Sequence, residues 1–256
     1  AVTINVSGEA LPEEPGGKVT ITTTTTTTSR NEKFSITRED AAHYEMTQNS
    51  YTVDLQSGDL WQWDNNLKNL LLYEPAEGEK EDLRVIIKVT GLPVAESGQW
   101  DTASFILYKD DNNYITIGKK SHYAGFCYVV EKNETAVETS GDSIYNNVES
   151  GYLGITYKDG IVTLSAKADG GTWIDVANIT DHTIGNDYKI GFGAWESNDR
   201  SKNITFSDFK VGTSEDSFET LEALESVPFI NVTVNEEKIE IEKNPNIDTN
   251  GFLSNH

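Results

Sequence analysis

Apolar and polar side chains alternate along most of this chain, in short runs separated by polar turn clusters. In the clearest case, Phe105, Leu107, Ile115 and Ile117 are apolar at alternate positions on the two sides of the turn cluster 110–113. A period of two in a pair of runs joined by a turn predicts an antiparallel hairpin with one face in a core. This hairpin, within residues 105–123, is the clearest predicted element, and the other segments are compared with its pattern.

Similar patterns predict strands on both sides of the hairpin. Residues 51–55 and 83–89 alternate, the short apolar run before Pro75 indicates a buried strand, and turn clusters at 158–160 and 168–171 indicate two further hairpins. Roughly a dozen strands at regular spacing, with no convincing helix, are typical of a sandwich or jelly roll. We therefore expect an all-β domain over residues 29–212, built as a two-sheet antiparallel β-sandwich (jelly roll) with short flanking segments.

The two flanks differ from this body. Residues 1–28 are expected to form a preceding strand and a Pro/Gly/Thr-rich linker, in which seven threonines (22–28) lead into the next strand. An edge strand is the alternative for that β-branched run. Residues 213–256 are acidic at first and predict a short helix with Ser214 as its N-cap. Alternation returns after Pro228, either as the start of a further β segment or as a strand that packs on the main body.

The net charge and the cysteine content exclude several classes of partner and site. The formal net charge is −22 at pH 7, which argues against nucleic acid and against anionic membrane surfaces and fits an extracellular or cell-surface protein. Cys127 is the one cysteine, so neither an intrachain disulfide nor a cysteine zinc site can form, and we expect a buried thiol. Ala1 begins directly in strand-like sequence, without a signal peptide, so we expect a segment of a longer protein.

Aromatic residues that lie beside amides and carboxylates in the sequence are the best candidates for a ligand-binding site. Sugar binding needs flat aromatic faces for the apolar side of a pyranose ring and polar groups for its hydroxyls. Trp61 and Trp63 point the same way if their stretch is extended, and Trp195 is a second candidate platform. The alternative is that these indoles cover a sheet edge. The predicted carbohydrate-binding residues are Trp61, Trp63, Trp195, Asp64, Asn66, Asp199 and Tyr123.

Catalytic carboxylates would show a different pattern. Glycoside hydrolases on such a fold need two acidic side chains on one face of a strand, about 5–9 Å apart. No predicted strand carries that pattern, and the acidic residues of 77–82 read as a solvated loop. We expect no catalytic residue in this segment.

Several segments in order, among them YTVDLQSGDLW, FILYKDDNNYITIG, YKIGFGAW and ITFSDFKVG, resemble the concanavalin A-like and laminin-G-like domains of bacterial modular carbohydrate-active proteins. The non-catalytic C-terminal domain of bacterial β-xylosidases is the nearest group, and the resemblance covers residues 34–212. It implies two curved antiparallel sheets that bind a glycan or complete a neighbouring active site. It also implies a structural calcium in some members, for which Asp208 with Glu39, or Asp40, is the candidate ligand pair here.

The sequence therefore predicts a non-catalytic carbohydrate-binding module of an extracellular bacterial multimodular glycan-degrading protein. Its expected partners are an oligo- or polysaccharide and neighbouring domains of the same chain, with no nucleic acid and no membrane. A structural or adhesive spacer module without sugar binding is the first alternative. A glycoside hydrolase or lyase on the same fold is the second. Exposure of Trp61, Trp63 and Trp195 would favour the binding module over the spacer.

Overall fold

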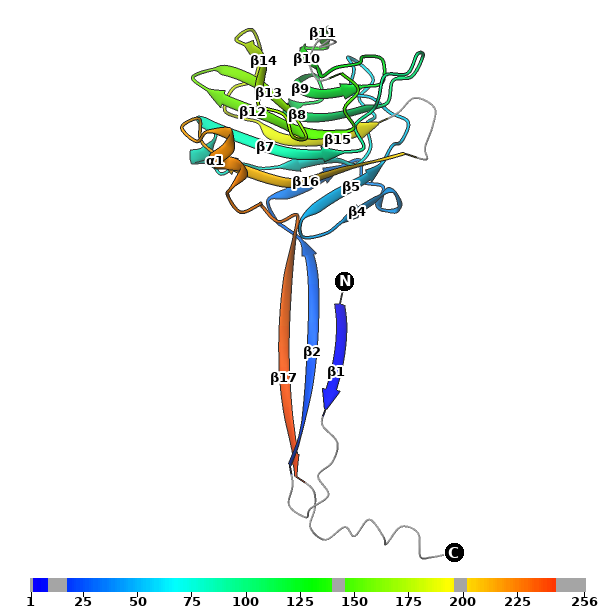
Figure 1. Ribbon diagram of the computed structural model, residues 1–256, viewed down its shortest axis with the longest axis vertical. Helices are drawn as coiled ribbons and strands as arrows, with labels where there is room; N and C mark the ends of the chain where they lie inside the picture. The colour runs from blue at the N-terminus through cyan, green and yellow to red at the C-terminus, as the bar shows by residue number, and fades with distance from the viewer. Residues whose placement is uncertain (1, 9–17, 140–145, 196–201, 243–256) are drawn as a thin grey trace, which may run out of the picture. The chain divides into compact units, whose positions relative to one another are not determined.

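The computed structural model describes residues 2–8, 18–139, 146–195 and 202–242, and these residues form two compact units. The larger unit, residues 31–230, is the sandwich. Within it, the described strands make two seven-stranded sheets whose paired strands are all antiparallel (Figure 1). The predicted fold class, an all-β two-sheet antiparallel sandwich of the concanavalin A-like kind, is confirmed.

The first sheet has the strand order β11-β10-β9-β8-β15-β6-β3. These strands are β3 (Phe34–Thr37), β6 (Leu70–Tyr73), β8 (Thr102–Asp110), β9 (Asn113–Lys120), β10 (Cys127–Lys132), β11 (Thr135–Thr139) and β15 (Lys189–Trp195). The predicted hairpin is β8–β9, and its register places Phe105 opposite Ile117 and Leu107 opposite Ile115.

The second sheet has the order β14-β13-β12-β7-β16-β5-β4. Its strands are β4 (Tyr44–Met46), β5 (Ser50–Asp54), β7 (Asp82–Thr90), β12 (Ser150–Lys158), β13 (Ile161–Ala168), β14 (Ile174–Ile179) and β16 (Asn203–Gly212). Two single 3-10 turns, Ala41–His43 and Glu77–Glu79, interrupt the loops. The predicted turns at 158–160 and 168–171 join β12 to β13 and β13 to β14, and Gly160 and Gly170 hold the positive φ values of 72° and 73° that these turns need.

The core lies between the two sheets. Inward side chains of both sheets are almost fully buried, and Phe192 sits in an aromatic cluster with Phe34, Phe105 and Phe209 at ring-centre distances of 6.2, 5.5 and 5.0 Å. Cys127 is buried as expected, and burial raises the pKa of its thiol to about 12. A second, smaller apolar cluster covers the outward face of the first sheet. The first sheet is therefore buried on both faces in part of its area.

The segment after β16 belongs to the sandwich. The helix α1 (Phe218–Glu222) is five residues long, and its N-cap is Ser217, whose hydroxyl accepts a hydrogen bond from the Thr220 amide at 3.1 Å. The prediction of a short helix is confirmed, but Ser214 is not its cap. The sandwich unit extends to residue 230 rather than ending near 212. The reason is that Leu221 and Phe229 bury their side chains completely against it.

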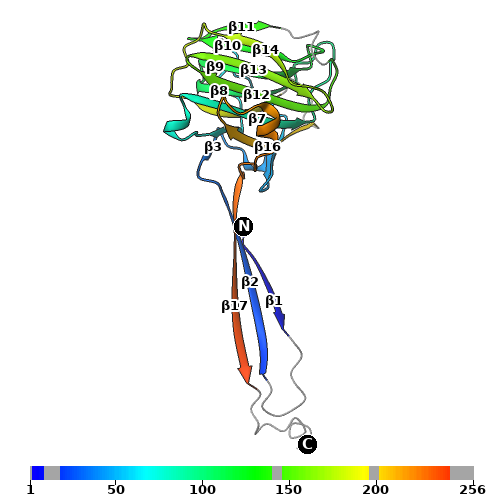
Figure 2. The same cartoon turned by 60° about the vertical axis from the view of Figure 1, so that its left-hand side comes forward.

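The smaller unit combines the two ends of the chain, residues 1–30 and 231–256. Its described part is a three-stranded sheet of β1 (Val2–Gly8), β2 (Lys18–Arg30) and β17 (Ile230–Glu242), in the order β1-β2-β17. Figure 2 shows β2 and β17 running in opposite directions. The threonines expected to form a linker all lie inside β2, where residues 22–27 pair with β1. β-branched side chains favour this extended pairing. The predicted turn 11–17 lies outside the described residues.

Across the described part of the chain, no helix is long and apolar enough to cross a membrane.

Candidate functional site

A long loop between β5 and β6, residues 55–69, lies over the outward face of the first sheet. Leu60 and Leu67 of this loop are each 1% exposed. They pack on outward-facing residues of the strands beneath them, namely Leu70, Leu72, Ile106, Tyr114, Val129 and Trp195. The loop is therefore a packed layer on the sheet, and its polar residues are presented at defined places.

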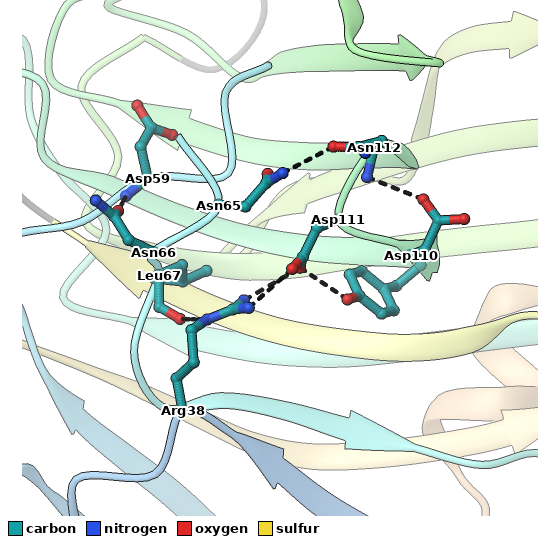
Figure 3. Close-up of polar contacts among 9 residues, drawn as sticks. Arg38, Asp59, Asn65, Asn66, Leu67, Asp110, Asp111 and Asn112 are labelled. Atoms are coloured by element: carbon teal, nitrogen blue, oxygen red, sulfur yellow. Dashed lines mark hydrogen bonds and ion pairs between the residues drawn. The ribbon is translucent and has the colours of Figure 1, made fainter. Parts of the chain in front are cut away.

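An arginine clamp holds the C-terminal side of this loop (Figure 3). The Arg38 guanidinium donates to both carboxylate oxygens of Asp111, at 2.8 and 3.1 Å, and its Nε donates to the Leu67 carbonyl oxygen at 2.5 Å. The Tyr108 hydroxyl donates to the same carboxylate at 2.8 Å. The side-chain amides of Asn65 and Asn112 are also hydrogen-bonded, at 2.7 Å. These contacts fix the loop to the tip of the β8–β9 hairpin.

Asp59 organises the N-terminal side of the loop. Its Oδ1 accepts hydrogen bonds from the amides of Leu60 and Trp61, at 2.7 and 3.1 Å. The Asn66 side chain accepts one from the Asp59 amide at 2.8 Å, and the Asp59 carbonyl accepts from the Asn66 and Leu67 amides at 3.1 and 3.0 Å. Burial raises the pKa of the Asp59 carboxyl, and the nearby Lys120 charge opposes that shift.

A buried glutamate supports the middle of the loop from below. Glu131 on β10 is 1% exposed, and its Oε2 accepts a hydrogen bond from the Gln62 amide at 2.9 Å. The Tyr114 hydroxyl lies 2.8 Å from both Glu131 Oε2 and the Leu60 carbonyl oxygen, so its single proton serves one of them at a time. Within the described residues Glu131 Oε1 has no hydrogen-bond partner. Burial accordingly raises the pKa of Glu131.

Two adjoining pockets lie where this loop meets Trp100, just before β8, and residues of β9, β11 and β15. The first, of about 230 Å³, is lined by Ser57, Gly58, Asp59, Asp64, Asn66, Trp100 and Trp195. The second, of about 340 Å³, is lined by Asp59, Trp61, Trp100, Lys120 and Glu138. Asp59 and Trp100 belong to both. We call the two pockets together the tryptophan groove.

The aromatic rings of the groove are held in place by their neighbours. Trp100 is stacked on His122, with ring centres 4.1 Å apart and planes at 11°. The Trp61 ring centre lies 5.3 Å from the Lys120 ammonium nitrogen, and Lys120 forms an ion pair with Glu138. Ring orientation is thus largely set before any ligand binds, which lowers the entropic cost of binding.

The structure brings several predicted residues together here. Trp61, Asp64 and Asn66 line the groove. Tyr123 lies beside it, because its hydroxyl donates to Glu138 at 3.1 Å and its ring meets His122 edge-on. Trp63 is 75% exposed but lines neither pocket.

Trp195 differs from its expected role as an exposed platform. It is 6% exposed, because the loop from β5 to β6 covers the sheet at that point, and it forms part of the wall of the first pocket. Asp199 lies outside the described residues. Exposure of all three indoles was expected to distinguish a binding module from a spacer. Trp63 is exposed and Trp61 is half-buried, but Trp195 is buried.

Six groove residues were absent from the predicted set: Ser57, Gly58, Asp59, Trp100, Lys120 and Glu138. The hairpin pattern carries a signal for one of them, Trp100. Thr102 pairs with Lys120, so Trp100 and His122 stand equally far beyond that pair on the two strands. Extending an antiparallel register outward predicts that they meet. Glu138 reaches the groove through β11, for which the sequence carried no comparable pairing signal.

The candidate calcium ligands have other partners. Asp208 accepts a hydrogen bond from the Ser226 hydroxyl at 2.7 Å and lies 3.4 Å from the Lys210 ammonium nitrogen. Glu39 accepts a hydrogen bond from the Tyr44 hydroxyl. In the described ranges no group of three or more His, Cys, Asp or Glu side chains is placed to hold a metal ion. Calcium at Asp208 and Glu39 stays a prediction.

A further pocket of about 620 Å³ lies at the other side of the sandwich unit, lined by Glu74, Pro75, Glu77, Lys80, Glu81, Asn186 and Asp187. It is larger than either groove pocket, but none of these lining residues is aromatic. Lys80 and Glu74 form an ion pair there at 2.5 Å. Its composition is that of a charged, solvated surface, and the tryptophan groove is the better candidate for a binding site.

Comparison with known proteins shows the fold and no family. No family model matches this chain, and no curated protein sequence does. A functionally unknown protein from Saccharomyces cerevisiae has a similar structure, with a TM-score of 0.54 at 15% identity over 71% of this chain and 96% of that one. A bifunctional GH43-CE protein from Bacteroides eggerthii has a TM-score of 0.56 at 14% identity, over 71% of this chain and 25% of that one.

A xylan β-1,4-xylosidase from Bacillus halodurans has a TM-score of 0.52 at 13% identity, over 67% of this chain and 34% of that one. The chain thus spans about a quarter of the first bacterial protein and about a third of the second. At these identities the likeness concerns the fold alone. The expected resemblance is confirmed to this extent: the chain contains a two-sheet antiparallel β-sandwich that is structurally similar to a part of GH43 glycoside hydrolases and of a xylosidase.

Proposed function

We propose that the sandwich is a non-catalytic carbohydrate-binding module, and that the tryptophan groove is its binding site. One observation carries the proposal: Trp61 and Trp100 stand at the surface of a groove that also holds Asp59, Asp64 and Asn66. Indole faces match the apolar faces of sugar rings, and carboxylate and amide groups match their hydroxyls.

The structural likeness and the net charge support a proposal about the kind of protein to which this module belongs. A sandwich similar to part of a xylosidase and of a GH43-CE protein is consistent with a module that accompanies a glycan-degrading enzyme. We place it in an extracellular or cell-surface bacterial protein with several modules, where weak affinities gain from multivalency. The charge of −22 suits a polysaccharide partner better than nucleic acid or an anionic membrane. We assign no catalytic residue to it.

A glycan array on the purified chain, with and without Ca²⁺, is the direct test. Trp61→Ala and Trp100→Ala should each reduce binding to any hit about tenfold, which corresponds to roughly 1.4 kcal/mol. Trp63→Ala is the matched control, because it removes an exposed indole of the same loop that lines neither pocket. Hits unaffected by the first two changes would leave a binding module but reject this groove. Dependence on Ca²⁺ that disappears in Asp208→Asn would support the calcium prediction.

A spacer without sugar binding is the second candidate, and the smaller unit favours it. β2 and β17 are each 13 residues long, which corresponds to about 43 Å of extended chain. Strands of that length are suited to separating domains. A blank array from a folded protein would favour the spacer, because nothing in that role requires the tryptophan groove.

A further inference from the structure

The tryptophan groove has two parts of similar size that share one wall. We propose that the groove holds two consecutive rings of an uncharged oligosaccharide, one ring in each pocket, an inference that rests on the proposed function. We also propose that the carboxylates of the groove exclude chains of uronic acids. Four steps support this: the pocket volumes, the shared tryptophan, the shared carboxylate and the charge of the lining.

The volumes set the size of the ligand. Pockets for drug-sized ligands measure about 300–1,000 Å³. The two pockets, at about 230 and 340 Å³, lie at or below the lower end of that range. Each is therefore suited to a single sugar ring, and the two adjoining pockets are suited to a linked pair.

Trp100 is the residue that separates the two rings. It lines both pockets and is 45% exposed. His122 is stacked on one of its faces at a ring-centre distance of 4.1 Å, so the opposite face and the edge of the indole are the parts left for a ligand. An indole that is fixed in this way and borders both pockets can contact the rings on the two sides of one glycosidic linkage.

Asp59 is the polar counterpart of Trp100. Its Oδ1 is occupied by the Leu60 and Trp61 amides. Its Oδ2 has no hydrogen-bond partner within the described part of the chain, and Asp59 lines both pockets. A hydroxyl from either ring can donate to that oxygen, as ring hydroxyls flank a glycosidic linkage.

The charge of the lining decides the class of chain. Lys120 is the basic residue of the second pocket, and its ion pair with Glu138 offsets its charge. None of the described residues that line the first pocket is basic, and Asp59 and Asp64 both belong to it. An ionised uronate in that pocket would face two like charges, and no basic residue is among the described residues that line it, which disfavours binding.

Isothermal titration of the full chain with mono-, di- and trisaccharides of xylose, glucose, galactose and mannose tests the two-ring claim. For the sugar that binds, the disaccharide should bind at least tenfold more tightly than the monosaccharide, and the trisaccharide less than threefold more tightly than the disaccharide. Trp100→Ala should remove the disaccharide advantage, whereas the control Trp63→Ala should keep it. Equal affinity for the mono- and disaccharide overturns the claim, as does a steady gain up to the trisaccharide.

Oligogalacturonides of matched length test the claim about charge. At pH 7 and low salt the digalacturonide should bind at least tenfold more weakly than the neutral disaccharide. Asp64→Asn and added salt should each narrow that difference, because both reduce the repulsion. Equal binding of neutral and uronic chains overturns the claim and leaves sugar binding intact. A folded protein that binds no sugar in this panel or on the array would instead overturn the proposed function itself.

Discussion

The arginine clamp makes a sharp prediction for Arg38→Lys. Lysine keeps the positive charge, and it tolerates the φ of 48° at this position as well as arginine does, so the change adds no backbone strain. What it removes is the planar fork, because one ammonium group cannot reproduce a bidentate contact with Asp111 and a bond to the Leu67 carbonyl at once.

The expected cost follows from the bonds that are lost. Hydrogen bonds contribute roughly 0.5–1.5 kcal/mol each when neutral and 1.5–3 kcal/mol when one partner is charged. The Arg38 and Asp111 side chains are 30% and 28% exposed, so solvent screening places them at the low end. Losing one bond of each kind should lower the free energy of unfolding by about 2 kcal/mol. The amides of Asn66 and Leu67, in the loop that the clamp holds, should exchange hydrogen faster.

Urea unfolding followed by tryptophan fluorescence measures the first quantity, and hydrogen exchange by mass spectrometry over residues 57–69 measures the second. Asp181→Asn is the control. It breaks the exposed ion pair with Lys132 and should change neither. A cost below about 0.5 kcal/mol together with unchanged loop exchange would contradict the clamp as the anchor of the loop. A double-mutant cycle with Asp111→Asn should return a coupling energy of about 1–2 kcal/mol.

Three further changes test the layer beneath the groove and the packing of the sheets. Tyr114→Phe removes the hydroxyl shared by Glu131 and Leu60 and should cost about 1–3 kcal/mol in urea unfolding, since a buried acceptor loses its donor; a neutral result would contradict that network. Burial raises the folded-state pKa of Glu131 above its ordinary 4.5, so the folded state holds the proton longer and stability should fall as pH rises through that window. Glu131→Gln should therefore be more stable than the parent protein at pH 7 and no more stable near pH 4, and a difference independent of pH would refute this. Gly118→Ala should prevent folding, as its Cβ would lie 2.0 Å from the Ala103 carbonyl oxygen, whereas Gly78→Ala, with open space around it, should fold normally in circular dichroism.

Local pattern determined the architecture of the sandwich. Phe105, Leu107, Ile115 and Ile117 alternate, and burying one face of a strand requires that alternation, so the hairpin could be predicted from the sequence alone. The apolar run of β6 carried a further signal. All four of its residues are buried, and a run without alternation is typical of a strand covered on both faces. Trp61, Asp64 and Asn66 could be grouped because they lie within six positions of one another in the sequence.

The remaining groove residues depend on contacts between segments far apart in the chain. Trp100 and Lys120 arrive from the base of the β8–β9 hairpin and Glu138 from β11, and only the path of the loop from β5 to β6 brings them to Asp59. The same loop buries Trp195, which the sequence predicted to be exposed.

The threonine run and the short helix, at the two ends of the sandwich in the sequence, also show what the sequence left open and the tertiary structure decided. A threonine run is compatible with a linker or a strand, and its pairing with β1 decides for the strand. Either Ser214 or Ser217 could cap a helix in this segment. The observed helix begins after Ser217, and in that helix the Leu221 side chain is buried against the sandwich. The sequence by itself therefore determined where most strands of the sandwich lie and which face of those strands is apolar, because these follow from neighbours one or two positions away. Only the tertiary structure decided which loop covers the outward face and which side chains meet there, because both depend on strand order and on contacts across the whole chain.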